Sequence, residues 1–150
     1  MSNPLSPSVI EHFAARLLAL NAQSKRLWGT LEPAPMLAHL RTSLEISLGR
    51  KTIKDESTFL SRTIIRFVAL YLLPIPRGRI KAADSFFSSE VGSVEAERAK
   101  LVETLHEFMA AANAHPSRRT VHPFFGSLSL NQWRRLHGKH FDHHLRQFGM

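Results

Sequence analysis

The stretch "LNQWRRLHGKHFDHHLRQF" (residues 130–148) repeats apolar residues at the three- and four-residue steps of an α-helix and carries four histidines within eight positions. Ser129 or Asn131 can cap its first turn. In an α-helix, residues four apart lie about 40° from each other and one turn up, so their side chains converge. His140 and His144 have this spacing. The sequence therefore predicts a long helix that presents two histidines on one face.

A helical wheel places these two histidines on the buried side. Trp133 falls within about 20° of His140, so the His140 and His144 side chains are expected to point toward the core. His143 lies at the edge of the buried face and is the weaker candidate for a site. His137 lies on the His144 side but about two turns below it, and the spacing leaves its role open.

The rest of the chain also follows helical periods. No segment shows the alternating pattern of strands, and residues 117–129, "SRRTVHPFFGSLS", are expected to form a loop. Four long helices with one additional helix between the second and third predict an all-α, up-and-down four-helix bundle, as a single domain over residues 1–150. The helices are expected at about Pro7–Asn21, Met36–Leu48, 56–73 after a cap at Asp55, Val94–Ala114 after a cap at Ser93, and 130–148.

The additional helix contains the most apolar run of the chain, "IIRFVALYLLPIP" (residues 64–76). Arg66 interrupts this run and Pro74 stops it, so it falls short of the about 20 apolar residues that span a bilayer. We expect the helix to be buried, in the core or at the two-fold interface of a homodimer, and we expect no membrane partner. Residues 74–90 are expected to form a long loop, and long loops in compact domains are often functional.

Composition narrows the chemistry. The chain has no cysteine, which excludes disulfides, zinc–thiolate sites and a protein-borne thiol nucleophile. Its first residues lack the basic and apolar regions of a secretory signal, and we expect a cytoplasmic protein. The net charge of +8 attracts nucleic acid, anionic lipid and small carboxylates or phosphates without choosing between them.

His39 is the natural third ligand for a metal ion held by His140 and His144. It lies on the apolar side of the second helix, next to Leu40 and one turn from Met36, where an unpartnered polar ring would cost stability. Two imidazoles on one helix need a further ligand from a facing helix. Three neutral imidazoles would leave positions open for water or substrate, as in catalytic sites. For His39 taken alone, a hydrogen-bonded core histidine is the ordinary alternative.

The sequence does not identify the groups that orient the metal ligands, and it places the other histidines outside the site. The partners of the outward imidazole nitrogens stay open between Glu45, Glu103 and backbone carbonyls. The histidines expected to be structural or at the surface are His12, His106, His115 and His122, the last of which could line a cavity.

Three segments together carry a family resemblance: "WRRLHGKHFDHHLRQFG", "HPFFGSLS" and, upstream, "MLAHLRTSLE". Over essentially the whole chain they resemble an uncharacterised branch of the DinB-like superfamily of four-helix metalloproteins. The C-terminal motif is H-x3-H followed by glutamine three residues later. The resemblance implies a DinB-like bundle and a divalent zinc, nickel or iron ion bound by His39, His140 and His144, with Gln147 as the matching glutamine. The two extra histidines of the last helix have no fixed role in that pattern.

Members of this superfamily with known function are similar in binding a divalent metal, and several use low-molecular-weight thiols. The resemblance implies a metal-dependent enzyme that activates a small nucleophile, with thiol S-transfer as one such reaction. Because the chain has no cysteine, a thiol must arrive with a small-molecule substrate, and an anionic one would be attracted by the positive field. The candidate anchors for such an anion are Arg77, Arg79, Lys81, Arg118 and Arg119.

Two other classes of function remain as alternatives. A nucleic-acid-binding or stress-associated interaction module would use the basic stretch "RRLHGKH" (residues 134–140), but the sequence contains no recognisable DNA-binding motif. A non-catalytic bundle scaffold or homodimer would use the apolar helix as its interface.

Overall fold

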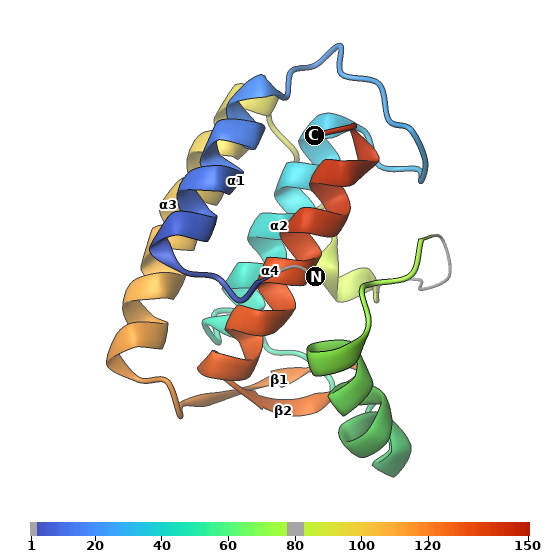
Figure 1. Ribbon diagram of the computed structural model, residues 1–150, viewed down its shortest axis with the longest axis vertical. Coiled ribbons are helices and arrows are strands. Elements are labelled where there is room, and N and C mark those ends of the chain that lie inside the picture. The colour runs from blue at the N-terminus through green and yellow to red at the C-terminus, as the bar shows by residue number, and fades with distance from the viewer. Residues whose placement is uncertain (1–2, 78–82) are drawn as a thin grey trace.

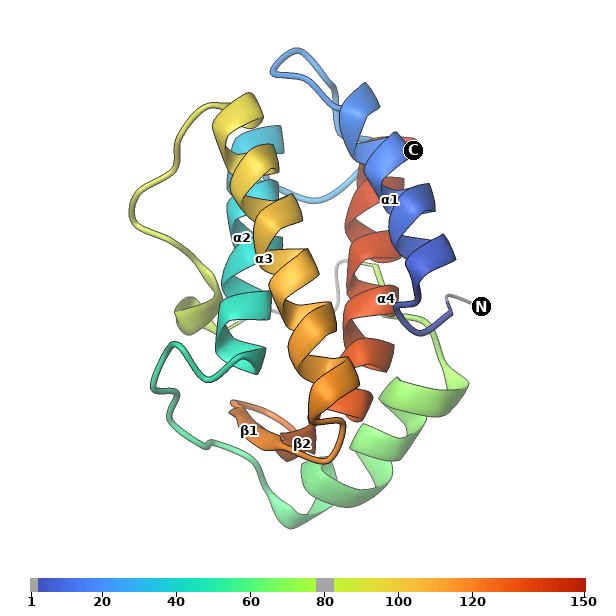
Figure 2. The same ribbon diagram turned by 90° about the vertical axis from the view of Figure 1, so that its left-hand side faces the viewer.

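Four long α-helices lie side by side (Figure 1). The computed structural model describes residues 3–77 and 83–150. In these, α2 packs against α3 and α4, and α1 and α3 also pack against α4. The view in Figure 2 shows the same four helices with roughly parallel long axes. The predominantly helical fold is confirmed, and the helix bounds are α1 (Pro7–Ala19), α2 (Pro33–Ser47), α3 (Val94–Ala114) and α4 (Leu130–Gln147).

Side-chain caps start three of these helices where the sequence places them. The Ser6 and Ser93 hydroxyls accept hydrogen bonds from the backbone three residues on, at the starts of α1 and α3. At α4, Ser129 accepts from the Gln132 backbone N–H while the Gln132 side chain accepts from the Ser129 N–H. This capping box satisfies two backbone N–H groups that have no partner within the helix. It fixes the residue at which α4 begins, and therefore which face of the helix each histidine occupies.

The core lies between the four helices. Its largest fully buried side chains are Trp133, Phe108 and Phe141, and the leucines of all four helices pack around them. Burial of such side chains is the main favourable term in folding. The space between the helices is therefore filled by residues of α1 to α4 themselves.

A short β-hairpin occupies part of the segment that was expected to be a loop. β1 (Arg119–His122) pairs antiparallel with β2 (Gly126–Ser129), so the expectation of a strand-free chain is wrong. Each strand is only four residues long, too short for an alternating pattern to stand out. The Thr120 hydroxyl donates to the Ser47 carbonyl and joins the hairpin to the end of α2.

The segment between α2 and α3 contains an additional helix at residues 59–72, as expected, which we call the outer helix. It includes two π-type turns, η1 (Ser61–Ile65) and η2 (Val68–Leu72). The expectation that it packs in the core is wrong, since only Ser61 and Leu70 of this helix are buried. Thr58 rather than Asp55 caps its start, because the Thr58 hydroxyl accepts from the Ser61 N–H. A 3-10 turn, η3 (Asp84–Phe86), follows before α3.

Lys139 of α4 holds the outer helix in place. Its ammonium donates to the Ala69 and Leu73 carbonyls, at 2.7 and 2.6 Å, where a helix C-terminus favours positive charge. Burial, together with the nearby charge of Arg135, lowers the pKa of Lys139.

None of the helices in the described part of the chain combines the length and the apolar character needed to cross a membrane.

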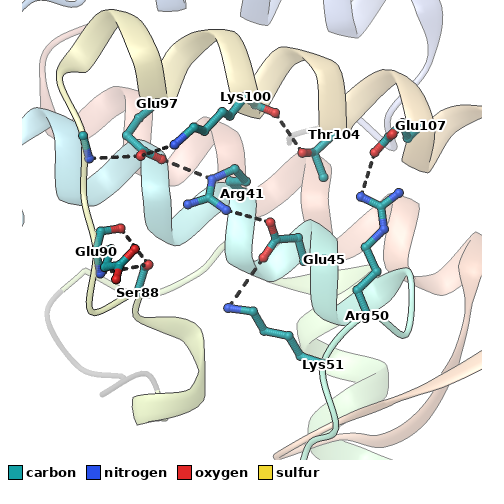
Figure 3. Close-up of polar contacts among 11 residues, drawn as sticks. Arg41, Glu45, Arg50, Lys51, Ser88, Glu90, Glu97, Lys100, Thr104 and Glu107 are labelled. Carbon is teal, nitrogen blue, oxygen red and sulfur yellow. Dashed lines mark hydrogen bonds and ion pairs between the residues drawn. The ribbon is translucent and has the colours of Figure 1, made fainter.

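A buried carboxylate links α2 to α3. Glu97 is fully buried and accepts from the Arg41 guanidinium at 3.1 Å and from the Gly92 N–H at 3.1 Å (Figure 3). Lys100 lies 3.5 Å away, and Arg41 also pairs with Glu45 at 2.6 Å. Burial acts to raise the pKa of Glu97, but the Gly92 N–H and Arg41 outweigh it and lower the pKa below 4.5.

Replacing Glu97 by glutamine is expected to lower the free energy of unfolding at neutral pH by about 2 kcal/mol, because Arg41 loses its buried counter-charge. Folding lowers the pKa of Glu97, so its contribution is fully present above the unfolded-state value of about 4.5 and is lost as the pH falls through the folded-state pKa. Urea unfolding should therefore show the gap between wild type and Glu97→Gln closing below about pH 4.5. Glu103→Gln, at an exposed position of α3, is the control. A gap that stays constant down to about pH 3 contradicts this account.

Candidate metal centre

The structure brings together three of the histidines singled out from the sequence. The His140 Nε2 atom lies 2.9 Å from Nε2 of His39 on α2 and 3.0 Å from Nε2 of His144 on α4. The potential ligand atoms of the three rings all lie within 4.8 Å of one another. A residue of the second long helix and two residues one turn apart on the last helix therefore meet at one point.

A hydrogen bond at Nδ1, the ring nitrogen that faces away from the cluster, fixes the orientation of His39. Its Nδ1 lies 3.1 Å from the Phe86 carbonyl of η3, and a carbonyl oxygen only accepts, so the Nδ1 atom carries the hydrogen. In a neutral imidazole, Nε2 is then a bare lone pair. The Phe87 ring stacks on His39, with ring centroids 5.1 Å apart and planes at 23°. These contacts direct the lone pair of His39 toward α4.

His144 is oriented in the same way by a side chain. Its Nδ1 lies 2.6 Å from Oε1 of Gln147, and the Gln147 amide donates in turn to the Trp28 carbonyl at 3.4 Å. Because the amide nitrogen faces a carbonyl, the Gln147 oxygen faces His144 and accepts its Nδ1 hydrogen. Gly29 makes room for this contact, since a Cβ there would lie 2.1 Å from the Gln147 Nε2 and the φ of 82° already favours glycine. The lone pair of His144 also points toward His140.

Burial keeps the three rings uncharged near neutral pH. It lowers the pKa of His39 to about 4, although the Phe86 carbonyl acts in the opposite direction. Burial and the neighbouring His39 lower the pKa of His144 to about 3. The pKa of His140 is well below its ordinary value because of burial and the two adjacent imidazoles. Neutral imidazole is the form that binds a metal ion.

The three ring nitrogens cannot all find hydrogen-bond partners among themselves. His140 can donate one hydrogen at most from Nε2, and two bare nitrogens face it. A buried lone pair without a partner is costly, whereas a divalent cation would satisfy all three nitrogens at once. Three imidazoles suit zinc, nickel, copper or iron rather than magnesium or calcium. His39 and His144 are buried, and His140 is partly exposed as a residue.

The other two histidines of α4 lie outside this cluster. His137 is fully buried, stacks on Trp133 and lies 3.0 Å from the Ser47 hydroxyl. His143 is half-buried, with its ring 4.7 Å from that of Trp28. His137 therefore belongs to the core beside the hairpin, and His143 lies at the edge of the cluster.

The remaining histidines mostly follow expectation. His12, His106 and His115 are exposed. His122 was expected at the surface, but it is half-buried, and its ring lies 4.7 and 5.2 Å from those of Phe125 and Trp133. Burial lowers its pKa to about 3. The unforeseen hairpin explains this error, because β1 turns His122 toward α4.

The basic residues of the sequence are distributed differently from expectation. The stretch 134–140 is not a free basic face, since Arg134 donates to the Leu5 carbonyl and Lys139 to the outer helix. Arg118 and Arg119 contact the end of α2 and the hairpin rather than the cluster. Arg77 lies over Trp28, 5.3 Å from the ring centroid, and Arg79 and Lys81 fall outside the described residues.

Three aromatic residues around the cluster escaped the sequence analysis. Phe86 supplies the carbonyl for His39, Phe87 covers its ring, and Trp28 supplies the carbonyl for Gln147. The partners of His39 and His144 are thus a backbone carbonyl and Gln147, whereas Glu45 pairs with Arg41 and Glu103 is exposed. The only signal in the sequence was the length of the loop that contains both phenylalanines.

Comparison with protein families finds one match along nearly the whole chain, a family described as a protein of unknown function, DUF1569, over residues 8–149. The chain belongs to the DUF1569 family. The matched region of this DUF1569 protein contains all three clustered histidines and Gln147. Comparisons with curated proteins and with solved structures find no match.

Gln147 provides a direct test of the outer hydrogen bonds in this DUF1569 protein. Gln147→Met removes the acceptor of the His144 Nδ1 hydrogen and is expected to weaken binding of a divalent metal about 10- to 100-fold. Gln147→Glu keeps an acceptor for the His144 Nδ1 hydrogen but loses the donor to the Trp28 carbonyl, so it should retain more affinity than Gln147→Met. Competition with a chromophoric chelator measures both. Equal affinity of the methionine variant and the wild type would show that this hydrogen bond does not support a metal site.

Proposed function

We propose that this DUF1569 protein binds one divalent zinc, nickel or iron ion through His39, His140 and His144. The observation that carries the proposal is the convergence of two oriented, bare Nε2 atoms on a third ring nitrogen, at 2.9 and 3.0 Å. Such a set of donors leaves at least one coordination position for water or a substrate.

We further propose that the chain is a DinB-like protein with an up-and-down bundle. One histidine comes from the second long helix and two, one turn apart, from the last. Gln147 follows the second of these by three residues and contacts it. This arrangement supports the resemblance seen in the sequence.

The proposed activity is that of a metal-dependent enzyme that activates a small nucleophile, for which thiol S-transfer is the leading reaction. A divalent ion, when bound, lowers the pKa of a thiol or water that it coordinates. The protein would supply the binding surface beside it, where Trp28 lies between His143 and Arg77. Arg77 forms no ion pair within the described residues, so its charge is available to a carboxylate on the substrate. Arg77 favours an anionic substrate, and the choice of a thiol rests on the family resemblance.

Cobalt(II) provides a spectroscopic test of metal binding and of thiol binding to the metal. Added to metal-free protein, it should produce the strong visible absorption of a low-coordinate ion, and mercaptoacetate should then add a sulfur-to-cobalt charge-transfer band. The neutral thiol 2-mercaptoethanol is expected to bind more weakly, and Arg77→Gln should reduce the difference between the two thiols.

Two adjacent positions provide a matched pair of variants for this experiment. His144→Ala should abolish the cobalt spectrum because it removes a ligand, whereas His143→Ala should keep it. Circular dichroism melting shows whether each variant is folded. A cobalt spectrum that survives His144→Ala excludes the proposed ligand set, and a cobalt spectrum unchanged by either thiol excludes thiol activation.

A further inference from the structure

The outer helix exposes an unusually large number of apolar side chains. Phe59 is 84% exposed, Ile64 63% and Phe67 56%. Patches of this kind on a protein surface mark sites of interaction. The other exposed apolar residues of this helix, together with the residue after it, are Leu60, Ile65, Tyr71, Leu72 and Leu73.

The outer helix is attached firmly, so this face cannot simply fold back onto the core. Leu70 is its buried apolar contact, and Lys139 binds the Ala69 and Leu73 carbonyls from behind. Arg135 lies over the Tyr71 ring, 4.9 Å from its centroid. In Figure 1 the outer helix, drawn in green, projects past the end of α4 beside the hairpin. A flat surface could therefore reach it without meeting the long helices.

The charge of this face is positive. Residues 57–77 contain three arginines and no acidic residue. Asp55 pairs with Arg62 at 3.1 Å. Arg66 donates only to the Ser127 carbonyl, at 3.3 Å, and neither it nor Arg135 forms an ion pair within the described residues. An apolar face with uncompensated arginines is complementary to a surface that is apolar inside and anionic outside.

We propose that the outer helix docks on the surface of an anionic lipid bilayer. Phe59, Ile64 and Phe67 would enter the boundary between headgroups and acyl chains, and Arg66 and Arg135, which form no ion pair within the described residues, would contact phosphates. The hairpin turn lies beside the start of this segment, because the Glu56 N–H donates to the Pro123 carbonyl, and the next residue, Phe124, is 50% exposed. The proposal departs from the expectation of no membrane partner, which rested on the lack of a run long enough to cross a bilayer. The lack of a spanning helix in the described residues does not bear on docking at the surface.

Charge argues against a second copy of the chain as the occupant. A two-fold interface places the same patch of both subunits together, which would bring two patches of the same positive charge against each other. Like charges at such an interface oppose association. A bilayer with anionic headgroups instead supplies the opposite charge.

Co-sedimentation of the full chain with lipid vesicles tests the proposal. Binding to vesicles of phosphatidylcholine with phosphatidylglycerol is expected, with roughly tenfold weaker binding to phosphatidylcholine alone and a loss of binding as salt is raised. Phe59→Ser/Phe67→Ser should reduce binding to the anionic vesicles by roughly tenfold or more. Arg66→Gln/Arg135→Gln should remove most of the preference for anionic lipid.

Matched variants far from this face separate its contribution to vesicle binding from non-specific hydrophobic and electrostatic binding. Leu18→Ser changes an apolar residue of α1 that is 71% exposed, and Lys25→Gln/Lys100→Gln removes two positive charges elsewhere. Both should bind as the wild type does. Absence of binding to anionic vesicles at low salt would overturn the proposal, as would equal losses in the control variants. A dimer in light scattering that Phe59→Ser/Phe67→Ser dissociates would assign the face to a second copy instead.

Discussion

Two hydrogen bonds determine what the centre of this protein can do. The Nδ1 hydrogen of His39 goes to the Phe86 carbonyl, and that of His144 goes to Gln147. Both rings are thereby committed to presenting a lone pair toward His140, and burial keeps them uncharged. The rest of the fold supports this constraint: the cap at Ser129 sets the start of α4, η3 brings the Phe86 carbonyl to α2, and the segment before α2 brings Trp28 to Gln147.

The helix starts and the pairing of His140 with His144 could be predicted from the sequence, because they depend on residues close together in the chain. The four-residue spacing of His140 and His144 guarantees that they share a helix face, and Ser93 and Ser129 mark helix starts by their own chemistry. His39 was expected to face inward from the apolar residues around it, and it is buried.

The parts that could not be predicted depend on how separate segments meet. The contact of Trp28 with Gln147 requires the positive φ of Gly29, and the partner of His39 is a backbone atom that has no side-chain signal. Period alone also cannot tell a buried apolar helix from an exposed one, which is why the outer helix was misplaced. The hairpin strands were too short to show their alternation, and His122 was misplaced with them.

The metal centre and the outer helix are connected through neighbouring residues. Lys139 holds the end of the outer helix, and the next residue, His140, faces the cluster. The chain then runs from Leu73 to Arg77, which lies over Trp28. The outer helix and the histidine cluster are thus both held by the same part of α4.

The central claim is that three imidazoles share one ion. X-ray absorption at the metal edge, on protein purified without an affinity tag, tests it most directly. The account predicts about one equivalent of zinc, nickel or iron, with three imidazole nitrogens at about 2.0–2.1 Å, and loss of that metal in His39→Ala. Protein that carries no divalent ion, or metal retained undiminished in His39→Ala, would contradict it.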